Sequence, residues 1–308
     1  MTRRANLTLL IALAVAFASG VLALLVSIGS AGIVVFAHGA AGLAVVALVR
    51  WKAPIARRGI SRARPDRSLA LLLAALAVAT LVTGVVHVLG LGDAGPLTTL
   101  GWHIGLAVAL VPLVVLHLIA RPQRPRRGDL TRGAFLRLAG LIVVAAGAKL
   151  ALDAVAAPRA ATGSLRRDRP APTSWLDDSA PSRPTSWDMR LAGLPVHEVV
   201  ASLDCTSGWY AVNRWRGVRV ADLLGPLPAG TGSIVVQSDT GYGRRFGTGD
   251  VSGLLLATHL DGEPLPRDIG GPVRLVAPGR RGFWWVKWVR SVEPSGRPSW
   301  WQSPFPLQ

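Results

Sequence analysis

The sequence predicts a membrane bundle of about five α-helices followed by a soluble α+β domain. Residues 1–157 contain five apolar segments, each long enough to cross a bilayer as a helix of roughly 20 residues. The basic residues of this half gather in the connections between the segments. From residue 187 the pattern changes to short β-rich runs separated by Gly-, Pro- and Asp-rich turns. We therefore expect a transmembrane bundle over 1–157, a linker over 158–186 and a soluble domain over 187–308.

The charge of the chain supports a membrane protein. The 308 residues are 50% hydrophobic and carry a formal net charge of +17. Much of this charge lies in short segments between long apolar runs, which is typical of a polytopic membrane protein and not of a nucleic-acid groove. We therefore expect membrane lipid as a partner and no nucleic acid.

The expected spans lie near residues 9–28, 32–49, 68–89, 97–120 and 134–157. The first is interpreted as a retained helix because it lacks a small-x-small cleavage site and a second span follows closely. Within the fifth span, Lys149 and Asp153 are four residues apart and are expected to pair with each other.

Basic residues predict the orientation of the spans. Arg3 and Arg4 precede the first span, seven basic residues lie between the second and third, and five lie between the fourth and fifth. The other two connections contain none. Because cytoplasmic loops carry an excess of Lys and Arg, the N-terminus is predicted to be cytoplasmic. Five crossings then give a multi-pass protein of the cell membrane whose C-terminal domain is extracytoplasmic.

The second half reads as one small mixed domain. The segment 158–186 is rich in Arg, Pro, Ser, Asp and Ala, and two interpretations are open: an irregular linker or strap over the next domain, and plain disorder. No Gly-x-Gly-x-x-Gly lies between a strand and a helix, so a Rossmann domain is not indicated. The expected strands are 187–194, 217–220, 233–237, 273–276 and 284–292, and the expected short helices are 196–203, 221–224 and 250–258.

Cys205 is the only cysteine of the chain. It cannot form an intrachain disulfide, and an exposed thiol in an oxidising compartment is vulnerable to oxidation. Two interpretations are open: a small buried core residue, and a thiolate bound to a soft transition metal.

Several motifs over about residues 187–298 resemble one family. Asp-Cys-Thr-Ser-Gly-Trp-Tyr (204–210) is followed by Trp-Arg-Gly-Val (215–218) and Ala-Asp-Leu-Leu (221–224). Later come Leu-Ala-Thr-His-Leu-Asp-Gly-Glu-Pro-Leu-Pro (256–266), Gly-Gly-Pro-Val-Arg-Leu-Val-Ala-Pro-Gly (270–279) and Gly-Phe-Trp-Trp-Val-Lys-Trp-Val (282–289). In order, spacing and content these motifs resemble the molybdopterin-binding domain of the sulfite oxidase family. The resemblance implies a sulfite-oxidase-like α+β domain and a molybdopterin-dependent oxidoreductase.

The resemblance also implies residue roles. In that family the motif cysteine is the protein thiolate ligand of molybdenum, which implies a metal-binding and catalytic role for Cys205. Arg274 and Lys287 match family positions that contact the molybdenum–molybdopterin cofactor. Arg280 and Arg281 lie between them, and either bind the cofactor or form a solvated basic hairpin tip.

Tyr210 and the polar pair Arg244 and Arg245 are candidates to face the substrate, and Tyr210 and Arg245 are assigned the catalytic role. The chain departs from the family at Ile269, where relatives often have His or Asn before Gly-Gly-Pro. It also ends soon after Trp301, without the C-terminal dimerisation domain of sulfite-oxidising members, so we expect a short reductase-like member.

Four of the six histidines fall in the spans: His38, His87, His103 and His117. Ionisable residues at that depth are costly and usually functional. His103 and His117 are fourteen residues apart, close to four helical turns or about 21 Å, as stacked haems in a bundle require. Their surroundings and those of His38 resemble bacterial b-type cytochromes, which implies haem b held by His103 with His38 or His87. The other interpretation is polar contacts between helices.

Together these features predict a membrane-bound molybdopterin-dependent oxidoreductase. It would perform two-electron, oxygen-atom-transfer chemistry on a small-molecule substrate outside the cytoplasm. Haem b would couple it to the quinone pool or another redox partner. The alternative is a cofactor-free membrane-anchored binding or interaction module that retains the fold.

Overall fold

The computed structural model describes residues 2–60, 67–91, 98–120, 131–156, 158–171 and 180–304. The chain divides into two compact units, one of Met1–Val26 and Ser30–Gly163 and the other of Ser27–Gly29 and Ser164–Gln308. Parts of the two basic connections, at 61–66 and 121–130, lie outside the described residues, as do 172–179 of the expected linker.

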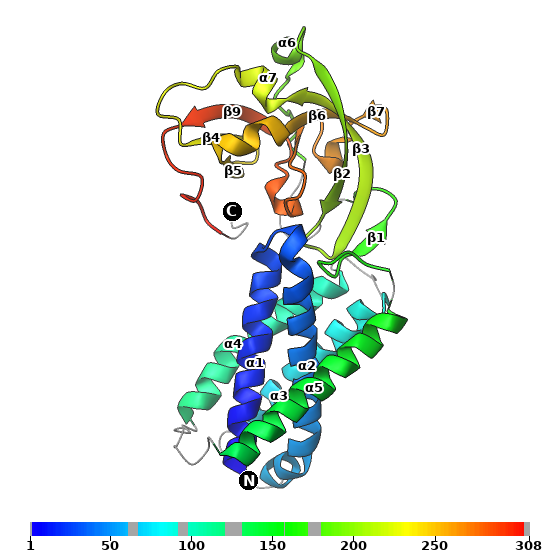
Figure 1. The fold of residues 1–308 in the computed structure, drawn as a ribbon, viewed down its shortest axis with the longest axis vertical. Coiled ribbons are helices and arrows are strands. Elements are labelled where there is room, and N and C mark those ends of the chain that lie inside the picture. Colours follow the sequence, from blue (N-terminus) through cyan, green and yellow to red (C-terminus); the bar gives the residue numbers. More distant parts are fainter. Residues whose placement is uncertain are drawn as a thin grey trace. The chain divides into compact units, whose positions relative to one another are not determined.

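Five long helices make up the first unit (Figure 1). Each contains a stretch of 21 to 23 residues with a mean hydropathy of 1.9 to 2.6, long and apolar enough to cross a membrane. Large apolar side chains cover their outer surfaces, including Ile33 at 82% and Ile119 at 71% exposed. The prediction of five long apolar helices is confirmed. They are α1 (Thr2–Leu25), α2 (Ile28–Ile60), α3 (Arg67–Val88), α4 (Thr99–Ala120) and α5 (Arg132–Val155).

Two details of this unit differ from or refine the sequence expectation. Helix α2 continues to Ile60, well past the expected end at residue 49. On α5, Lys149 is buried and forms the expected ion pair with Asp153 one turn later. A buried ammonium among apolar helices is stabilised by such a partner.

The second unit contains two sheets (Figure 1). In the larger sheet the eleven-residue strand β3 pairs with β1 in parallel and with β2 and β6 antiparallel, and β6 also pairs with β7 and β8. The smaller sheet has the antiparallel order β5-β4-β9. The strands are β1 (Leu165–Arg167), β2 (Val196–Asp204), β3 (Trp209–Arg219), β4 (Ser233–Ser238), β5 (Gly243–Phe246), β6 (Leu255–Leu260), β7 (Glu263–Pro264), β8 (Arg274–Val276) and β9 (Val289–Ser295).

Short helices connect these strands, and an apolar core fills the unit. The α-helices are α6 (Asp188–Leu191) and α7 (Val220–Leu224), and the 3-10 helices are Thr248–Gly253, Arg267–Ile269 and Gly282–Trp284. Trp215 and Trp285 are almost fully buried and meet edge to face at a ring-centroid distance of 5.4 Å. Burial of such large aromatic side chains is a main source of stability in a small domain.

Three secondary-structure predictions for this unit were wrong. The expected helix at 196–203 is strand β2, and the expected strand at 187–194 contains helix α6. The expected helix at 250–258 is a 3-10 helix followed by strand β6. In β2 and β6 the pairing with β3 decides the outcome, because long-range strand pairing overrides local propensity.

The segment before the domain contributes to its sheet. Residues of β1 pair with the start of β3, from Leu165 opposite Trp209 to Arg167 opposite Ala211. Further along, Thr185 donates two hydrogen bonds to the carboxylate of Asp239, both at 2.7 Å. The described parts of this segment therefore act as a strap, one of the two interpretations that the sequence leaves open.

Candidate active site

Cys205 lies in the hairpin loop that joins β2 to β3. Its backbone N–H donates to the Trp209 carbonyl at 2.8 Å, and the Gly208 N–H donates back to the Cys205 carbonyl at 3.1 Å. Gly208 has φ +91°, a conformation that glycine adopts without strain. The Cys205 side chain is buried, and its Sγ accepts the N–H of Ser207 at 3.5 Å. A sulfur that accepts an amide hydrogen bond is arranged as an acceptor, which suits a thiolate.

A buried ionic cluster adjoins this loop. Asp204, the residue before Cys205, is fully buried and accepts a hydrogen bond from the Ser164 hydroxyl at 2.7 Å. Arg281 is 3% exposed, and its Nη1 lies 3.2 Å from Asp204 Oδ1 in an ion pair. We call Ser164, Asp204 and Arg281 the Asp204 cluster.

The segment that carries Arg281 passes directly beside Cys205. Asp204 and Arg281 form an isolated parallel β-bridge. A Cβ added to the next residue, Gly282, would lie 2.9 Å from the Asp204 carbonyl oxygen and 3.0 Å from the Cys205 Cα, so only glycine fits. The Arg281 Nη1 faces Asp204 in this ion pair, whereas Nε has no hydrogen-bond partner among the described residues. A buried guanidinium N–H group of this kind is suited to an anionic ligand.

Arg274 and Lys287 meet around the segment 269–271. Arg274 on β8 is buried, donates from Nη1 to the Ile269 carbonyl at 2.6 Å, and lies 6.0 Å from the ring centroids of Trp215 and Trp285. A Cβ on Gly270, which has φ +111°, would lie 2.9 Å from the Lys287 Cβ. The structure therefore brings these two predicted cofactor residues to one place. Ile269 itself is buried and offers its backbone carbonyl there.

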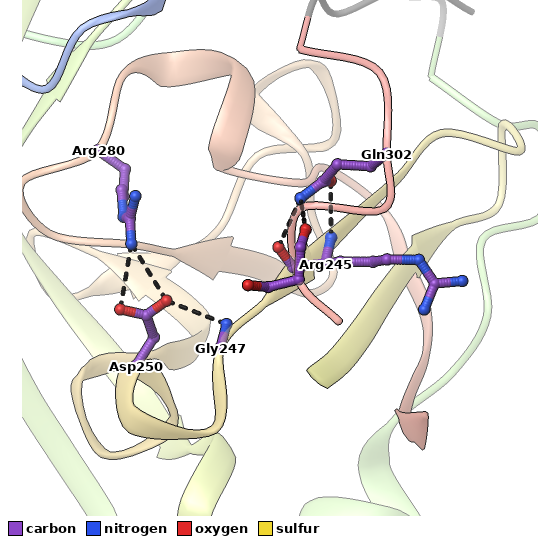
Figure 2. Close-up of polar contacts among 6 residues, drawn as sticks. Arg245, Gly247, Asp250, Arg280 and Gln302 are labelled. Atoms are coloured by element: carbon purple, nitrogen blue, oxygen red, sulfur yellow. Dashed lines mark hydrogen bonds and ion pairs between the residues drawn. The ribbon is translucent and has the colours of Figure 1, made fainter. Parts of the chain in front are cut away.

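Arg280, in contrast, is partly exposed and has an acidic partner. Figure 2 shows its guanidinium directed at Asp250, and Nη2 lies 3.1 Å from both carboxylate oxygens. The Asp250 carboxylate also accepts the N–H of Gly247 at 3.1 Å. Arg280 and Asp250 line a cavity of about 400 Å³. The two neighbouring arginines, Arg280 and Arg281, thus have different environments.

Arg245 points away from the Arg280–Asp250 pair (Figure 2). Its Nη1 donates to the Ser295 hydroxyl at 2.9 Å, and its backbone N–H and carbonyl bond to the side-chain amide of Gln302. Successive residues of a strand face opposite sides, so its neighbour Arg244 faces inward. Arg244 is buried and lies 5.0 Å and 5.5 Å from the ring centroids of Phe283 and Trp284.

Arg244 and Arg245 are predicted together as substrate-facing residues, and of the two it is Arg244 that lies against the 3-10 helix that directly follows Arg281. The alternation along β5, in which Arg244 shares the buried face with Phe246, indicates that Arg244 is the inward-facing arginine of the pair. Tyr210 is half-buried on β3, and its Cα stands opposite that of Asp204 in β2. Tyr210 is therefore placed next to the Asp204 cluster.

In the first unit, His38 and His103 form a pair. Their ring centroids are 5.8 Å apart, with an interplanar angle of 83°. The Nδ1 of His38 lies 2.8 Å from the Ala16 carbonyl, and that of His103 lies 2.8 Å from the Thr80 carbonyl. A carbonyl only accepts, so each Nδ1 carries the hydrogen and each Nε2 is left with a lone pair in the neutral ring.

A glycine faces each of these rings. A Cβ added to Gly20 would lie 3.0 Å from Cε1 of His38, and a Cβ added to Gly84 would lie 3.0 Å from Cε1 of His103. The helix pairs α1–α2 and α3–α4 therefore present their histidines in equivalent ways. His87 differs, because its Nε2 lies 3.2 Å from the Gly163 carbonyl. His117 lies fourteen residues beyond His103 on α4.

Among the described residues, no group of three or more His, Cys, Asp or Glu side chains is placed to hold a metal ion. A metal site with a single protein sulfur is compatible with this finding when a cofactor supplies the other ligands.

Comparisons with known proteins find similarity to molybdopterin-binding oxidoreductases in the second unit. Residues 179–301 match the model of the oxidoreductase molybdopterin binding domain. Mitochondrial sulfite oxidase of Macaca fascicularis is 37% identical over 119 residues, covering 33% of this chain and 22% of that protein. YuiH, an uncharacterized oxidoreductase of Bacillus subtilis, is 25% identical over 140 residues, covering 38% of this chain and 71% of that protein. The structure of the sulfane dehydrogenase SoxCD from Paracoccus pantotrophus matches with a TM-score of 0.34 and 25% identity, over 35% of this chain and 34% of that chain.

The chain spans about a fifth of the length of the sulfite oxidase that it matches. The comparisons confirm the prediction of a domain similar to the molybdopterin-binding oxidoreductase domain of sulfite oxidase, over residues 179–301.

Proposed function

We propose that this chain is a membrane-bound oxidoreductase that uses a molybdenum–molybdopterin cofactor to oxidise or reduce a small molecule outside the cytoplasm. The observation that carries the proposal is Cys205, a lone buried thiol whose sulfur accepts a backbone N–H within the matched region 179–301. When bound, the cofactor supplies two-electron, oxygen-atom-transfer chemistry.

The residues around Cys205 fit such a group. The thiolate is the protein ligand of the metal, and soft sulfur suits a metal whose other ligands include sulfur. Arg274 and Lys287, together with Arg281, supply positive charge for the phosphate and polar edges of the pterin. The buried Nε–H of Arg281, which lacks a hydrogen-bond partner among the described residues, supports its part in this set. Arg280 is the fourth member, and its bond to Asp250 makes its contribution the smallest.

Tyr210 and Arg245 are the proposed substrate-facing residues. The position of Tyr210 opposite Asp204 supports its role. The guanidinium groups of both arginines of the pair have protein partners, Ser295 for Arg245 and Tyr242 with Ser303 for Arg244. Arg244 is included in this role because it faces the aromatic side chains next to Arg281. An arginine against aromatic rings is pre-organised to bind an oxyanion.

Cys205→Ser in the full-length chain is the test of the proposal. We expect the wild-type protein to contain molybdenum, and the variant to lose both molybdenum and turnover with an artificial electron donor. Asp222→Asn, at a partly exposed side-chain hydrogen bond with His197, is the matched control and should retain both. Wild-type protein without molybdenum would favour the alternative, a cofactor-free binding module. That alternative is supported by Ile269, a buried apolar residue at a position where relatives often have a polar one.

The first unit is proposed to span the cell membrane and to hold haem b between His38 and His103. Metal–imidazole bonds are about 2.0–2.1 Å long, so two imidazoles on opposite sides of one iron have ring centroids roughly 6 Å apart. The observed separation of 5.8 Å and the two free Nε2 lone pairs support this ligand pair over one containing His87. Haem would pass electrons between the quinone pool, or another redox partner, and the molybdenum site. His117 is a candidate ligand of a second haem.

A further inference from the structure

Three chain segments converge on Asp204. Strand β2 ends there, the strap reaches it through the Ser164 hydroxyl, and the segment before Gly282 reaches it through the Arg281 guanidinium. Asp204 and Arg281 also form a backbone bridge. All three side chains of the Asp204 cluster are at most 3% exposed.

The strap holds both ends of the loop that contains Cys205. On one side Ser164 Oγ donates to Asp204, and on the other the Leu165 N–H donates to the Gly208 carbonyl at 2.8 Å. Cys205 lies between these two anchor points. Movement of either end would move the sulfur, since the loop between strands β2 and β3 contains only Cys205 to Gly208.

A buried ion pair is a costly way to stabilise a domain. Desolvation of the two charges offsets most of their attraction, and well-packed apolar residues of similar size often do as well. What the Asp204 cluster adds is direction, since the hydrogen bond from Ser164 and the close ion pair with Arg281 are both satisfied in one geometry only. The Asp204 cluster adjoins the one cysteine of the chain, where a fixed geometry has a use.

We propose that Ser164, Asp204 and Arg281 are positioning residues that fix the Cys205 sulfur for metal binding, and that the strap strand β1 is therefore part of the active-site architecture. The purpose of this positioning rests on the proposed function, in which Cys205 binds molybdenum. The cluster acts through the loop backbone and does not itself react.

Because the chain has one cysteine, alkylation of the full-length protein reports on this loop alone. The protein is prepared without cofactor in detergent, and the rate of iodoacetamide labelling is measured well below the unfolding temperature. Wild-type Cys205 is buried and should react slowly. Ser164→Ala removes one buried hydrogen bond and should raise the rate about tenfold, because the loop opens more often.

Two Arg281 variants separate charge and hydrogen bonding from general packing. Arg281→Met should raise the labelling rate at least as much as Ser164→Ala, whereas Arg281→Lys keeps a cation beside Asp204 and should restore most of the wild-type protection. Asp222→Asn is again the control, since it removes a carboxylate from a partly exposed hydrogen bond and should leave the rate unchanged. Ser164→Ala carries the test if Arg281→Met fails to fold.

In cofactor-loaded protein Ser164→Ala should change the Mo(V) electron paramagnetic resonance signal and Asp222→Asn should not, since a role in stability alone would not alter that signal. Wild-type labelling rates in folded Ser164→Ala and Arg281→Met would overturn the proposal, as would an equal rise in Asp222→Asn. The labelling does not depend on metal. A wild-type protein without molybdenum but with a protected loop would therefore reject the proposed function and retain the positioning role of the cluster.

Discussion

At the scale of single residues, glycines mark where the backbone of this protein must come close to another group. Gly282 allows the Arg281 segment to lie against Asp204 and Cys205, and Gly20 and Gly84 leave room for histidine rings. The sequence motifs pointed to Cys205, Arg274 and Lys287. They did not reveal Asp204 or Ser164, because a buried ion pair between distant segments leaves no local pattern.

Gly282→Ala should therefore damage the cysteine loop. Its Cβ would press on backbone atoms of Asp204 and Cys205, which cannot move aside as a flexible side chain can. Overpacking of this kind costs about 1–3 kcal/mol, so we expect a lower unfolding temperature and less bound molybdenum. Both are measured on the purified full-length protein.

Gly253→Ala is the matched control for that substitution. Gly253 is exposed, and an added Cβ would meet nothing within 4 Å. Unfolding temperature and molybdenum content should stay at wild-type values. Equal effects of the two substitutions would show that the close approach at Gly282 has no special role.

At the scale of elements, the apolar helices were predictable and the small domain was less so. A segment of more than twenty apolar residues has few structural alternatives to a long helix. Strands β2 and β6, in contrast, depend on their pairing with β3, and β6 is more than ten residues away from β3 in the sequence. The same limit applied to Arg244 and Arg245. Their positions on opposite faces of β5 became clear only when the strand and its burial were known.

The equivalent helix pairs α1–α2 and α3–α4 lead to a prediction about haem. His38→Ala and His103→Ala should each abolish a b-type signal in the reduced-minus-oxidised spectrum and in the pyridine haemochrome assay. His87→Ala should retain it, since His87 Nε2 is bonded to a carbonyl. Wild-type protein without any b-type spectrum would remove haem from the proposed function.

The glycines that face the histidines offer a finer test of the same element. Gly84→Ala places a methyl group 3.0 Å from the ring of His103, so the ring must turn and the haem signal should weaken. Gly105→Ala is the control on the partner helix, because an added Cβ there meets nothing within 4 Å. A b-type spectrum that is unchanged in Gly84→Ala would argue against His103 as a ligand.

At the scale of the whole molecule, the two units supply different parts of one proposed electron path. The second unit has one thiol, buried arginines and a matched molybdopterin domain, and the first has a histidine pair among apolar helices. Neither unit alone accounts for a path from a membrane electron donor to a polar substrate. The proposal therefore requires that the C-terminal unit be on the extracytoplasmic side, as the distribution of basic residues predicts.

Reporter fusions test this orientation directly. Alkaline phosphatase is active only after export, so a fusion after Gln308 should be active and a fusion in the basic connection between α4 and α5 should be inactive. The positive-inside rule gives both outcomes, because the connections with seven and five basic residues must share the cytoplasmic side with the N-terminus. The reverse pattern of activity would place Cys205 in the cytoplasm. A lone thiol there would need no protection from oxidation, and the case for an extracytoplasmic enzyme would fail even if molybdenum were bound.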